Sequence, residues 1–281
     1  MIVAWIALLT WPMVAIFFFA LLSVPAALVL TIVGGYLILP EQVGIDLPVL
    51  PRLDKDTIPV LSAILIAGLV ARKRPGTVLK GYIPRNPIVL GLLILLFLGV
   101  VGTVMTNGEP IFFADRFLPG LRLWDMMASG LVILMSILPF VLGRKYLATE
   151  EAQKTALKTM VVLGLGYTFL ALFEIRMSPQ LNVWIYGFFP HSFGQHIRGG
   201  GFRPLVFLNH GLWLAVFFAM SAVAAAGLAR AVQEKNQKAF YILAALWILG
   251  TLSLSKSLGA LLIALMFLGL LIMPQKLIRA G

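Results

Sequence analysis

The chain has 281 residues, of which 60% are hydrophobic and only 12% are charged, and its formal net charge is +11. Soluble domains carry about a quarter charged residues, so this composition excludes a water-soluble globule and a disordered chain, and it predicts a polytopic membrane protein. The sequence contains no cysteine, which excludes disulfides, thiolate metal sites and a cysteine nucleophile.

The first 40 residues contain no charged side chain. As one helix they would be roughly 60 Å long, about twice the hydrocarbon thickness of a bilayer. Proline and the residue before it disfavour helix, so we predict that the chain folds back at Ser23-Val24-Pro25. The segment lacks a basic n-region and its apolar run exceeds that of a cleaved signal peptide, so both halves are expected to remain as spans.

Seven further apolar segments have the length, or nearly the length, that a membrane span needs. They are 58–71, 88–106, 127–143, 159–173, 205–229, 239–255 and 257–273. Together with the two N-terminal spans they predict a single transmembrane domain over residues 1–281. The predicted fold class is an all-α integral membrane bundle of about nine helices.

Basic residues are divided unequally between the two sets of loops that these spans define. The loops 72–87, 144–158, 230–238 and 274–281 hold 14 of the 22 Lys and Arg residues and three acids, whereas the other loops hold eight basic and eight acidic residues. The positive-inside rule then places the first set in the cytoplasm, and the N-terminus and the loop 174–204 outside it. The basic excess therefore requires no nucleic-acid partner.

Residue types that bind anions gather in and just after the external loop 174–204, which is the candidate functional loop. They are His191, His196 and His210, with Arg176, Arg198 and Arg203. An arginine fork fits two phosphate oxygens, and the run Gly199-Gly200-Gly201 lets backbone N–H groups approach an anion without side-chain hindrance. Arg203 directly precedes an apolar span, where its charge would be costly without a partner.

Each of these features also has a structural alternative. The aromatic residues of the loop either stack on sugars or anchor the protein at the membrane interface. Arg198 and Arg203 either bind a substrate or contact lipid head groups, and Arg176 either binds a substrate or pairs with Glu174 at a helix end. The histidine spacings match no ligand motif such as H-E-x-x-H, so no metal site is predicted.

A lysine and two glycines in or beside the predicted spans indicate how these spans meet water and each other. Lys256, between the last two spans, either snorkels to the interface or faces a polar cavity. Gly164 and Gly166 predict close packing of the span 159–173 against a neighbouring helix. No phosphate-loop, dinucleotide-binding, kinase or nucleophile-elbow motif occurs in the sequence.

Three segments resemble a bacterial protein family. Residues 173–181 read Phe-Glu-Ile-Arg-Met-Ser-Pro-Gln-Leu, and residues 200–211 read Gly-Gly-Phe-Arg-Pro-Leu-Val-Phe-Leu-Asn-His-Gly. Both resemble the O-antigen ligase and polysaccharide polymerase superfamily, and residues 252–260, Leu-Ser-Leu-Ser-Lys-Ser-Leu-Gly-Ala, resemble a later span of the same proteins. The resemblance covers most of residues 40–273 and is most specific between Arg176 and His210.

The resemblance implies a glycosyltransferase of the bacterial inner membrane with a helical, GT-C-like architecture. Such a protein takes a glycan from an undecaprenyl-diphosphate carrier and transfers it, on the external face, to a saccharide or a lipid-core acceptor, without a metal or another cofactor. By position, Arg176 and Arg203 match the arginines that flank the donor. Members of the family have more spans, and a second external region would begin after Gly281, so the resemblance implies a C-terminally truncated chain.

For the reaction itself, His210 and Glu174 are the predicted catalytic residues. Burial favours a neutral imidazole at His210, which leaves a ring nitrogen to accept a proton. The predicted substrate-binding residues are Arg176, Arg198, Arg203, His191, His196 and Asn209. One alternative is a transporter or flippase of lipid-linked glycans, although the spans contain few ionisable residues to line a path. An inactive fragment or accessory subunit is the other.

Overall fold

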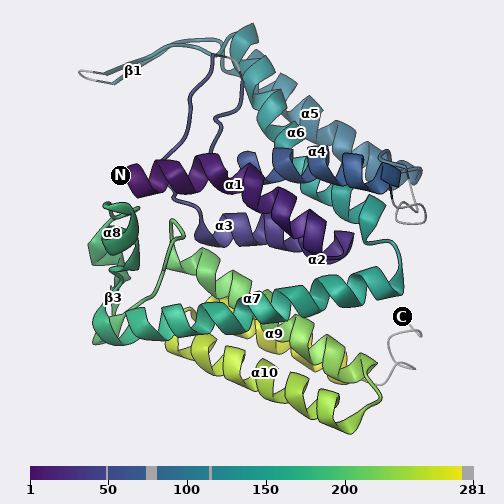
Figure 1. Cartoon of the computed structure of the whole chain (residues 1–281). Helices are drawn as coiled ribbons and strands as arrows, with labels where there is room; N and C mark the ends of the chain where they lie inside the picture. Colours follow the sequence, from purple (N-terminus) through teal and green to yellow (C-terminus); the bar gives the residue numbers. More distant parts are fainter. Residues whose placement is uncertain (49, 74–80, 114–115, 274–281) are drawn as a thin grey trace.

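The computed structural model describes residues 1–48, 50–73, 81–113 and 116–273, which form a helical bundle with two short β-hairpins (Figure 1). The elements are α1 (Ile2–Leu21), α2 (Val24–Val29), the π-helix η1 (Leu30–Gly34), α3 (Gly35–Ile38), α4 (Ile58–Lys73), α5 (Pro87–Thr106), β1 (Ile111–Phe113), β2 (Arg116–Leu118), α6 (Leu123–Tyr146), α7 (Glu150–Met177), α8 (Leu181–Tyr186), the 3-10 helix η2 (Phe193–His196), β3 (Ile197–Arg198), β4 (Gly201–Phe202), α9 (Gly211–Ala231), α10 (Lys235–Leu254) and α11 (Leu258–Ile272). Both hairpins, β1–β2 and β3–β4, are antiparallel.

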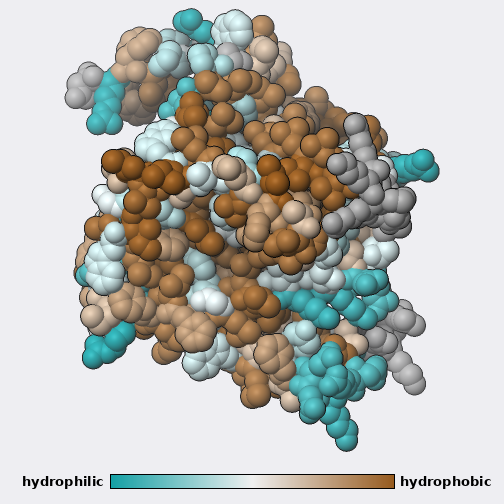
Figure 2. All heavy atoms as spheres, viewed as in Figure 1, coloured by the Kyte–Doolittle hydropathy of each residue, from teal (hydrophilic) through white to brown (hydrophobic). Residues whose placement is uncertain are grey.

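Six of these helices, α1, α5, α6, α7, α9 and α10, are long and apolar enough to cross a membrane. Three shorter apolar helices cover Val24–Ile38, Ile58–Val70 and Leu258–Leu271. The predicted class of an all-α, multi-pass membrane protein is therefore confirmed. Brown, hydrophobic atoms cover most of the molecule's face in Figure 2, as expected for a surface that contacts lipid.

The helices run between two ends of the bundle, which we call the loop end and the basic end (Figure 1). The loop end carries the segments 39–48, 50–57, 107–113, 116–122, 178–210 and 255–257. The basic end carries the connections 147–149 and 232–234, around which teal, hydrophilic residues gather in Figure 2. Residues 74–80 and 274–281, which belong to the predicted basic loops, lie outside the described residues.

The predicted break at 23–25 is confirmed, because α1 ends at Leu21 and α2 begins at Val24 with Pro25 in its first turn. The helix that follows contains the π-helical turn η1, and the Thr31 carbonyl in this turn accepts the indole N–H of Trp11 at 3.0 Å. This bond ties α1 to the second helix.

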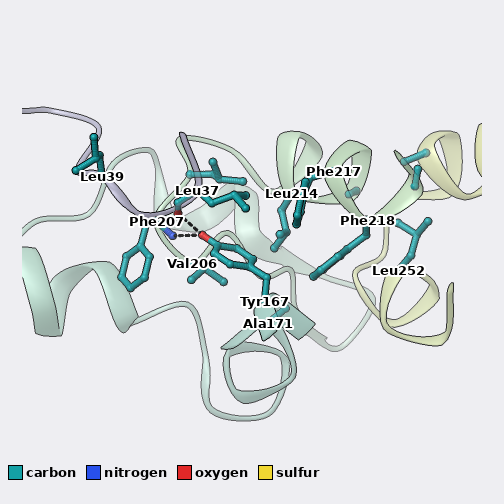
Figure 3. Packing of buried hydrophobic residues seen from close by; sticks show 14 of the residues in the cluster. Leu37, Leu39, Tyr167, Ala171, Val206, Phe207, Leu214, Phe217, Phe218 and Leu252 are labelled. Atoms are coloured by element: carbon teal, nitrogen blue, oxygen red, sulfur yellow. Dashed lines mark hydrogen bonds between the residues drawn. The ribbon is translucent and has the colours of Figure 1, made fainter. Parts of the chain in front are cut away.

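The largest buried cluster joins α7 and α9 to the loop end of α3 (Figure 3). At its centre, the Tyr167 hydroxyl donates to the carbonyl of Leu37 at 2.6 Å and accepts the backbone N–H of Phe207 at 3.4 Å. The tyrosine therefore satisfies two backbone groups that have no helical partner, and each such bond contributes about 1 kcal/mol. It holds three segments that lie far apart in the sequence.

Close packing of α7 against α9 is confirmed at Gly164 but not at Gly166. A Cβ atom at Gly164 would lie 2.7 Å from Cβ of Ser221 and 3.3 Å from Cδ1 of Ile248, whereas a Cβ atom at Gly166 would meet nothing within 4 Å. Only hydrogen at position 164 allows the two helix backbones to approach this closely.

We expect Gly164→Ala to destabilise the protein by about 1–3 kcal/mol, the usual cost of forcing an extra methyl group into a packed interface. Gly166→Ala is the matched control, because it adds the same methyl group to the same helix in open space. Unfolding of the purified protein in mixed micelles measures both variants. Equal stability of the two variants would contradict the packing described here.

The predicted start of the span 205–229 is wrong, because α9 begins at Gly211. Residues 205–210 form an irregular turn although four of them are apolar. Val206 has a positive φ of 56°, which interrupts a right-handed helix, and the backbone N–H groups of Leu205 and Val206 are held by the side chain of Glu174. A tertiary contact therefore replaces the first turn of the predicted span.

Candidate functional site

The end of α7 organises the loop that follows it through the side chain of Glu174. This side chain is fully buried. Its Oε1 accepts the backbone N–H of Leu181 at 3.1 Å, and its Oε2 accepts those of Leu205 at 2.9 Å and Val206 at 2.8 Å. One carboxylate therefore ties the start of α8 and the turn before α9 to the end of α7 through charge-assisted hydrogen bonds.

Arg203 lies on this turn and is buried, with 3% of its surface exposed. One terminal nitrogen of its guanidinium donates to Oγ of Ser257 at 2.6 Å, and Nε has no hydrogen-bond partner in the part of the chain that the structure describes. The ion pairs found among the described residues do not include Arg203. A Cβ atom at Gly211 would lie 2.9 Å from both Cγ and Nε of Arg203, so the arginine packs across the first residue of α9. A buried guanidinium without a counter-charge is costly, and a bound anion would offset that cost.

The three histidines meet beside this arginine. The ring centroid of His210 lies 5.6 Å from that of His191 and 5.7 Å from that of His196. Nδ1 of the buried His196 lies 3.2 Å from the carbonyl oxygen of Arg203. A carbonyl only accepts, so Nδ1 carries the proton and Nε2 keeps its lone pair. Nε2 of His196 is buried, and none of the described residues forms a hydrogen bond with it.

His210 is the N-cap of α9, and its Nδ1 accepts the backbone N–H of Leu212 at 3.0 Å. His191 is exposed, and its Nδ1 accepts the backbone N–H of Ser192 at 2.6 Å. In the neutral form both rings therefore carry their proton on Nε2, opposite to His196. The three histidines therefore present two N–H donors, on His191 and His210, and one available lone pair, on His196.

Electrostatics in this group favour an anionic ligand. Burial lowers the pKa of His196 to about 4; the hydrogen bond to the Arg203 carbonyl opposes this shift, whereas His210 adds to it. Burial also lowers the pKa of His210, and the charge of Arg203 adds to the effect. Burial and the charge of Arg198 lower the pKa of Arg203 itself. Basic groups that all disfavour one another's charge would be stabilised by an anion placed among them.

The turn between α10 and α11 completes the site. Lys256, with a positive φ of 54°, donates from Nζ to the backbone carbonyl of Arg198 and to that of Gly199, the latter at 3.1 Å. The sequence left open whether Lys256 snorkels to the interface or faces a polar cavity, and in the structure its ammonium group binds these two backbone carbonyls. The contact between Ser257 and Arg203 was not predicted; its only signal in the sequence is a pair of serines flanking a lysine inside an apolar run.

The other predicted site residues lie at the margin of the site that Arg203 and the three histidines form. Arg176 is exposed in the last turn of α7 and forms no ion pair with Glu174, whose carboxylate is taken by backbone amides. The side chain of Arg198 is exposed. Asn209 is half-buried next to His210. Within the described residues, no three His, Asp or Glu side chains are arranged to hold a metal ion.

We expect His196 to make the protein less stable as the pH falls from about 6.5 towards 4. The pKa of His196 is lowered in the folded state, so the unfolded chain binds a proton first, and stability is complete above the unfolded pKa and is lost below it. His196→Asn should flatten this part of the pH profile of unfolding, and the exposed His191→Asn should leave it unchanged. An unaltered profile for His196→Asn would contradict the buried, neutral state.

A scan against protein-family models finds no match to this chain, and no curated protein and no solved structure matches it. The resemblance to the O-antigen ligase and polysaccharide polymerase superfamily therefore rests on the quoted segments and stays a prediction. Fold and site together define a multi-pass membrane protein with a basic site at one end of its bundle, built from α7, the loop after it, the start of α9 and the α10–α11 turn.

Proposed function

We propose that this protein is a membrane glycosyltransferase of the O-antigen ligase or polysaccharide polymerase type. It would transfer a glycan from an undecaprenyl-diphosphate carrier to a saccharide or a lipid-core acceptor. The observation that carries the proposal is the buried guanidinium of Arg203, whose side-chain partner is Ser257 and which pairs with no carboxylate in the described part of the chain. A diphosphate supplies the missing negative charge.

In the proposed reaction, an acceptor hydroxyl attacks the anomeric carbon of the glycan while the bond from this carbon to the diphosphate oxygen breaks. The charge that develops on the leaving diphosphate is stabilised by Arg203, with Arg198 nearby. A base must take the hydroxyl proton. His196 presents the buried nitrogen with a free lone pair, and a bound diphosphate would raise its low pKa.

This assignment gives the predicted catalytic residues other tasks. The Nδ1 lone pair of His210 is engaged by the backbone N–H of Leu212, so its Nε2–H is free to donate to a glycan oxygen. Glu174 positions the turn that carries Arg203, since both of its oxygens accept backbone N–H groups. In this proposal His210 binds the substrate, Glu174 positions the backbone around Arg203, and His196 accepts the proton.

We also infer that the three shorter apolar helices cross the membrane, which gives nine spans in a GT-C-like bundle of the bacterial inner membrane. Successive helices run in alternating directions (Figure 1). Protein neighbours surround much of Val24–Ile38 and part of Ile58–Val70, which reduces the cost of their length, and α11 packs on the bundle through Ala260 and Ala264. The loop end would then face the periplasm, and the basic end, with Arg144, Lys145, Arg230 and Lys235, the cytoplasm.

Cysteine labelling tests this orientation without background, because the chain has no native cysteine. We expect a membrane-impermeant thiol reagent to label Ser192→Cys, at the loop end, in intact cells. Asn236→Cys, in the first turn of α10 at the basic end, should be labelled only after the membrane is opened. Labelling of position 236 but not 192 in intact cells would reverse the orientation.

The activity is tested with the purified chain in nanodiscs, supplied with an undecaprenyl-diphosphate-linked saccharide and an acceptor extracted from the native membrane. The expected products are elongated acceptor and free undecaprenyl diphosphate. Arg203→Lys and His196→Gln should lose most of the transfer, whereas the exposed Arg116→Lys on β2 should retain it. Movement of the intact donor between leaflets without release of undecaprenyl diphosphate would instead identify a flippase.

A further inference from the structure

A cavity of about 550 Å³ lies on another part of the bundle, between α6, α7, α9 and the segment from η1 to α4. Its inner wall is apolar and includes Pro139, Val216 and Met220. From Trp213 to Met220 the cavity follows α9 for seven residues, which is about 10 Å at 1.5 Å per residue. It therefore extends from the loop end into the part of the bundle where acyl chains would lie.

The mouth of this cavity, at the loop end, is aromatic and acidic. The rings of Tyr36 and Trp213 stack there with centroids 6.0 Å apart and an interplanar angle of 20°. Asp56 and Lys55 line the same mouth. Nζ of Lys55 forms an ion pair with Glu41 at 2.6 Å, so its charge is already compensated.

The carboxylate of Asp56 has no such partner in the described part of the chain, where its backbone N–H but not its side chain is hydrogen-bonded. In the sequence, the segment 41–57 that carries Lys55 and Asp56 contains four acids and two bases, a formal charge of −2. Burial raises the pKa of the Asp56 carboxyl; Lys55 opposes this shift, and Asp54 and Glu41 add to it. A cation at the mouth would stabilise the ionised carboxylate of Asp56, whereas a diphosphate there would destabilise it.

We propose that this cavity binds an amphiphile with an ammonium head group, placing the ammonium between Asp56 and the Trp213 ring and the alkyl chain between α6 and α9. The Asp56 carboxylate and the exposed indole of Trp213 line the same cavity, and groups of these two kinds recognise ammonium groups through ion pairing and the cation–π interaction. The apolar wall accepts the chain through the hydrophobic effect. This site goes beyond the glycosyltransferase proposal and does not depend on it.

Three probes with the same twelve-carbon chain test the head-group preference: dodecylamine, dodecanol and dodecanoate. Native mass spectrometry of the full chain measures how much of each is bound. Dodecylamine should bind about tenfold more tightly than dodecanoate, with dodecanol between them. Asp56→Asn should remove most of the difference, whereas Glu109→Gln, which neutralises an acid on another loop of the same end, should leave it intact.

A second variant keeps the test informative if Asp56→Asn does not fold. Val216→Phe fills the chain-binding part and should weaken dodecylamine and dodecanol to the same extent. Equal or tighter binding of dodecanoate by the natural protein, or an unchanged preference in folded Asp56→Asn, would overturn the proposal.

Two sources of such a head group are separated with nanodiscs that contain either phosphatidylethanolamine or phosphatidylglycerol. Selective retention of phosphatidylethanolamine by the natural protein, lost in Asp56→Asn, would identify a bilayer phospholipid as the occupant. Selective binding of dodecylamine without this retention would point to an amine-bearing glycolipid instead. Both results support an ammonium site and differ only in the source of the ligand.

Discussion

Replacement of Arg203 by lysine is expected to weaken binding of undecaprenyl diphosphate about 100-fold, the equivalent of losing roughly 3 kcal/mol of charge-assisted hydrogen bonding. Lysine keeps the positive charge but presents a point ammonium instead of a planar fork, so it cannot hold Ser257 and two phosphate oxygens together. Binding of radiolabelled undecaprenyl diphosphate to the protein in nanodiscs measures the effect.

Two further variants are measured in the same assay, one as a control and one as a test of the partner of Arg203. Arg116→Lys makes the same substitution on the exposed β1–β2 hairpin and should bind normally. Ser257→Ala removes the hydroxyl that orients the guanidinium and should reduce binding about tenfold while leaving the charge in place. Near-normal binding by a folded Arg203→Lys protein would mean that the diphosphate binds elsewhere.

The second large effect is expected at Glu174, where replacement by alanine should destabilise the protein by on the order of 3–5 kcal/mol. Three backbone N–H groups, those of Leu181, Leu205 and Val206, would lose a charged acceptor inside the bundle. Unfolding in mixed micelles gives the loss of stability. Glu151→Ala, which removes an exposed carboxylate from the first turn of the same helix, is the control and should change stability by less than about 1 kcal/mol.

The same residue distinguishes a positioning role from a catalytic one. Glu174→Gln keeps one acceptor oxygen and the shape of the side chain, so a positioning role predicts partial recovery of stability and of transfer together. A folded Glu174→Gln protein that binds undecaprenyl diphosphate normally but transfers no glycan would instead support a catalytic role for Glu174. Stability, binding and transfer are all measured on the same preparation of Glu174→Gln.

Several parts of the fold were predictable because they depend on local composition. A charge-free run twice the thickness of a bilayer must turn back, and Pro25 marks where it does so. The lengths of the apolar segments predicted all six long spans, although the start of α9 was placed six residues too early. Clustering of His and Arg in and just after the loop 174–204 also pointed to the part of the chain where the structure brings Arg203 and the three histidines together.

The sequence by itself determined which segments avoid water, because solvation preference is a property of each residue and its near neighbours. It did not determine how the loop end is assembled. Leu205 and Val206 look like the start of a helix, yet a carboxylate 31 residues away binds the N–H group of the first of them. Ser257 reaches Arg203 across 54 residues. Only the tertiary structure decided these pairings, since a single buried polar group takes whichever partner the packed helices bring within hydrogen-bond distance.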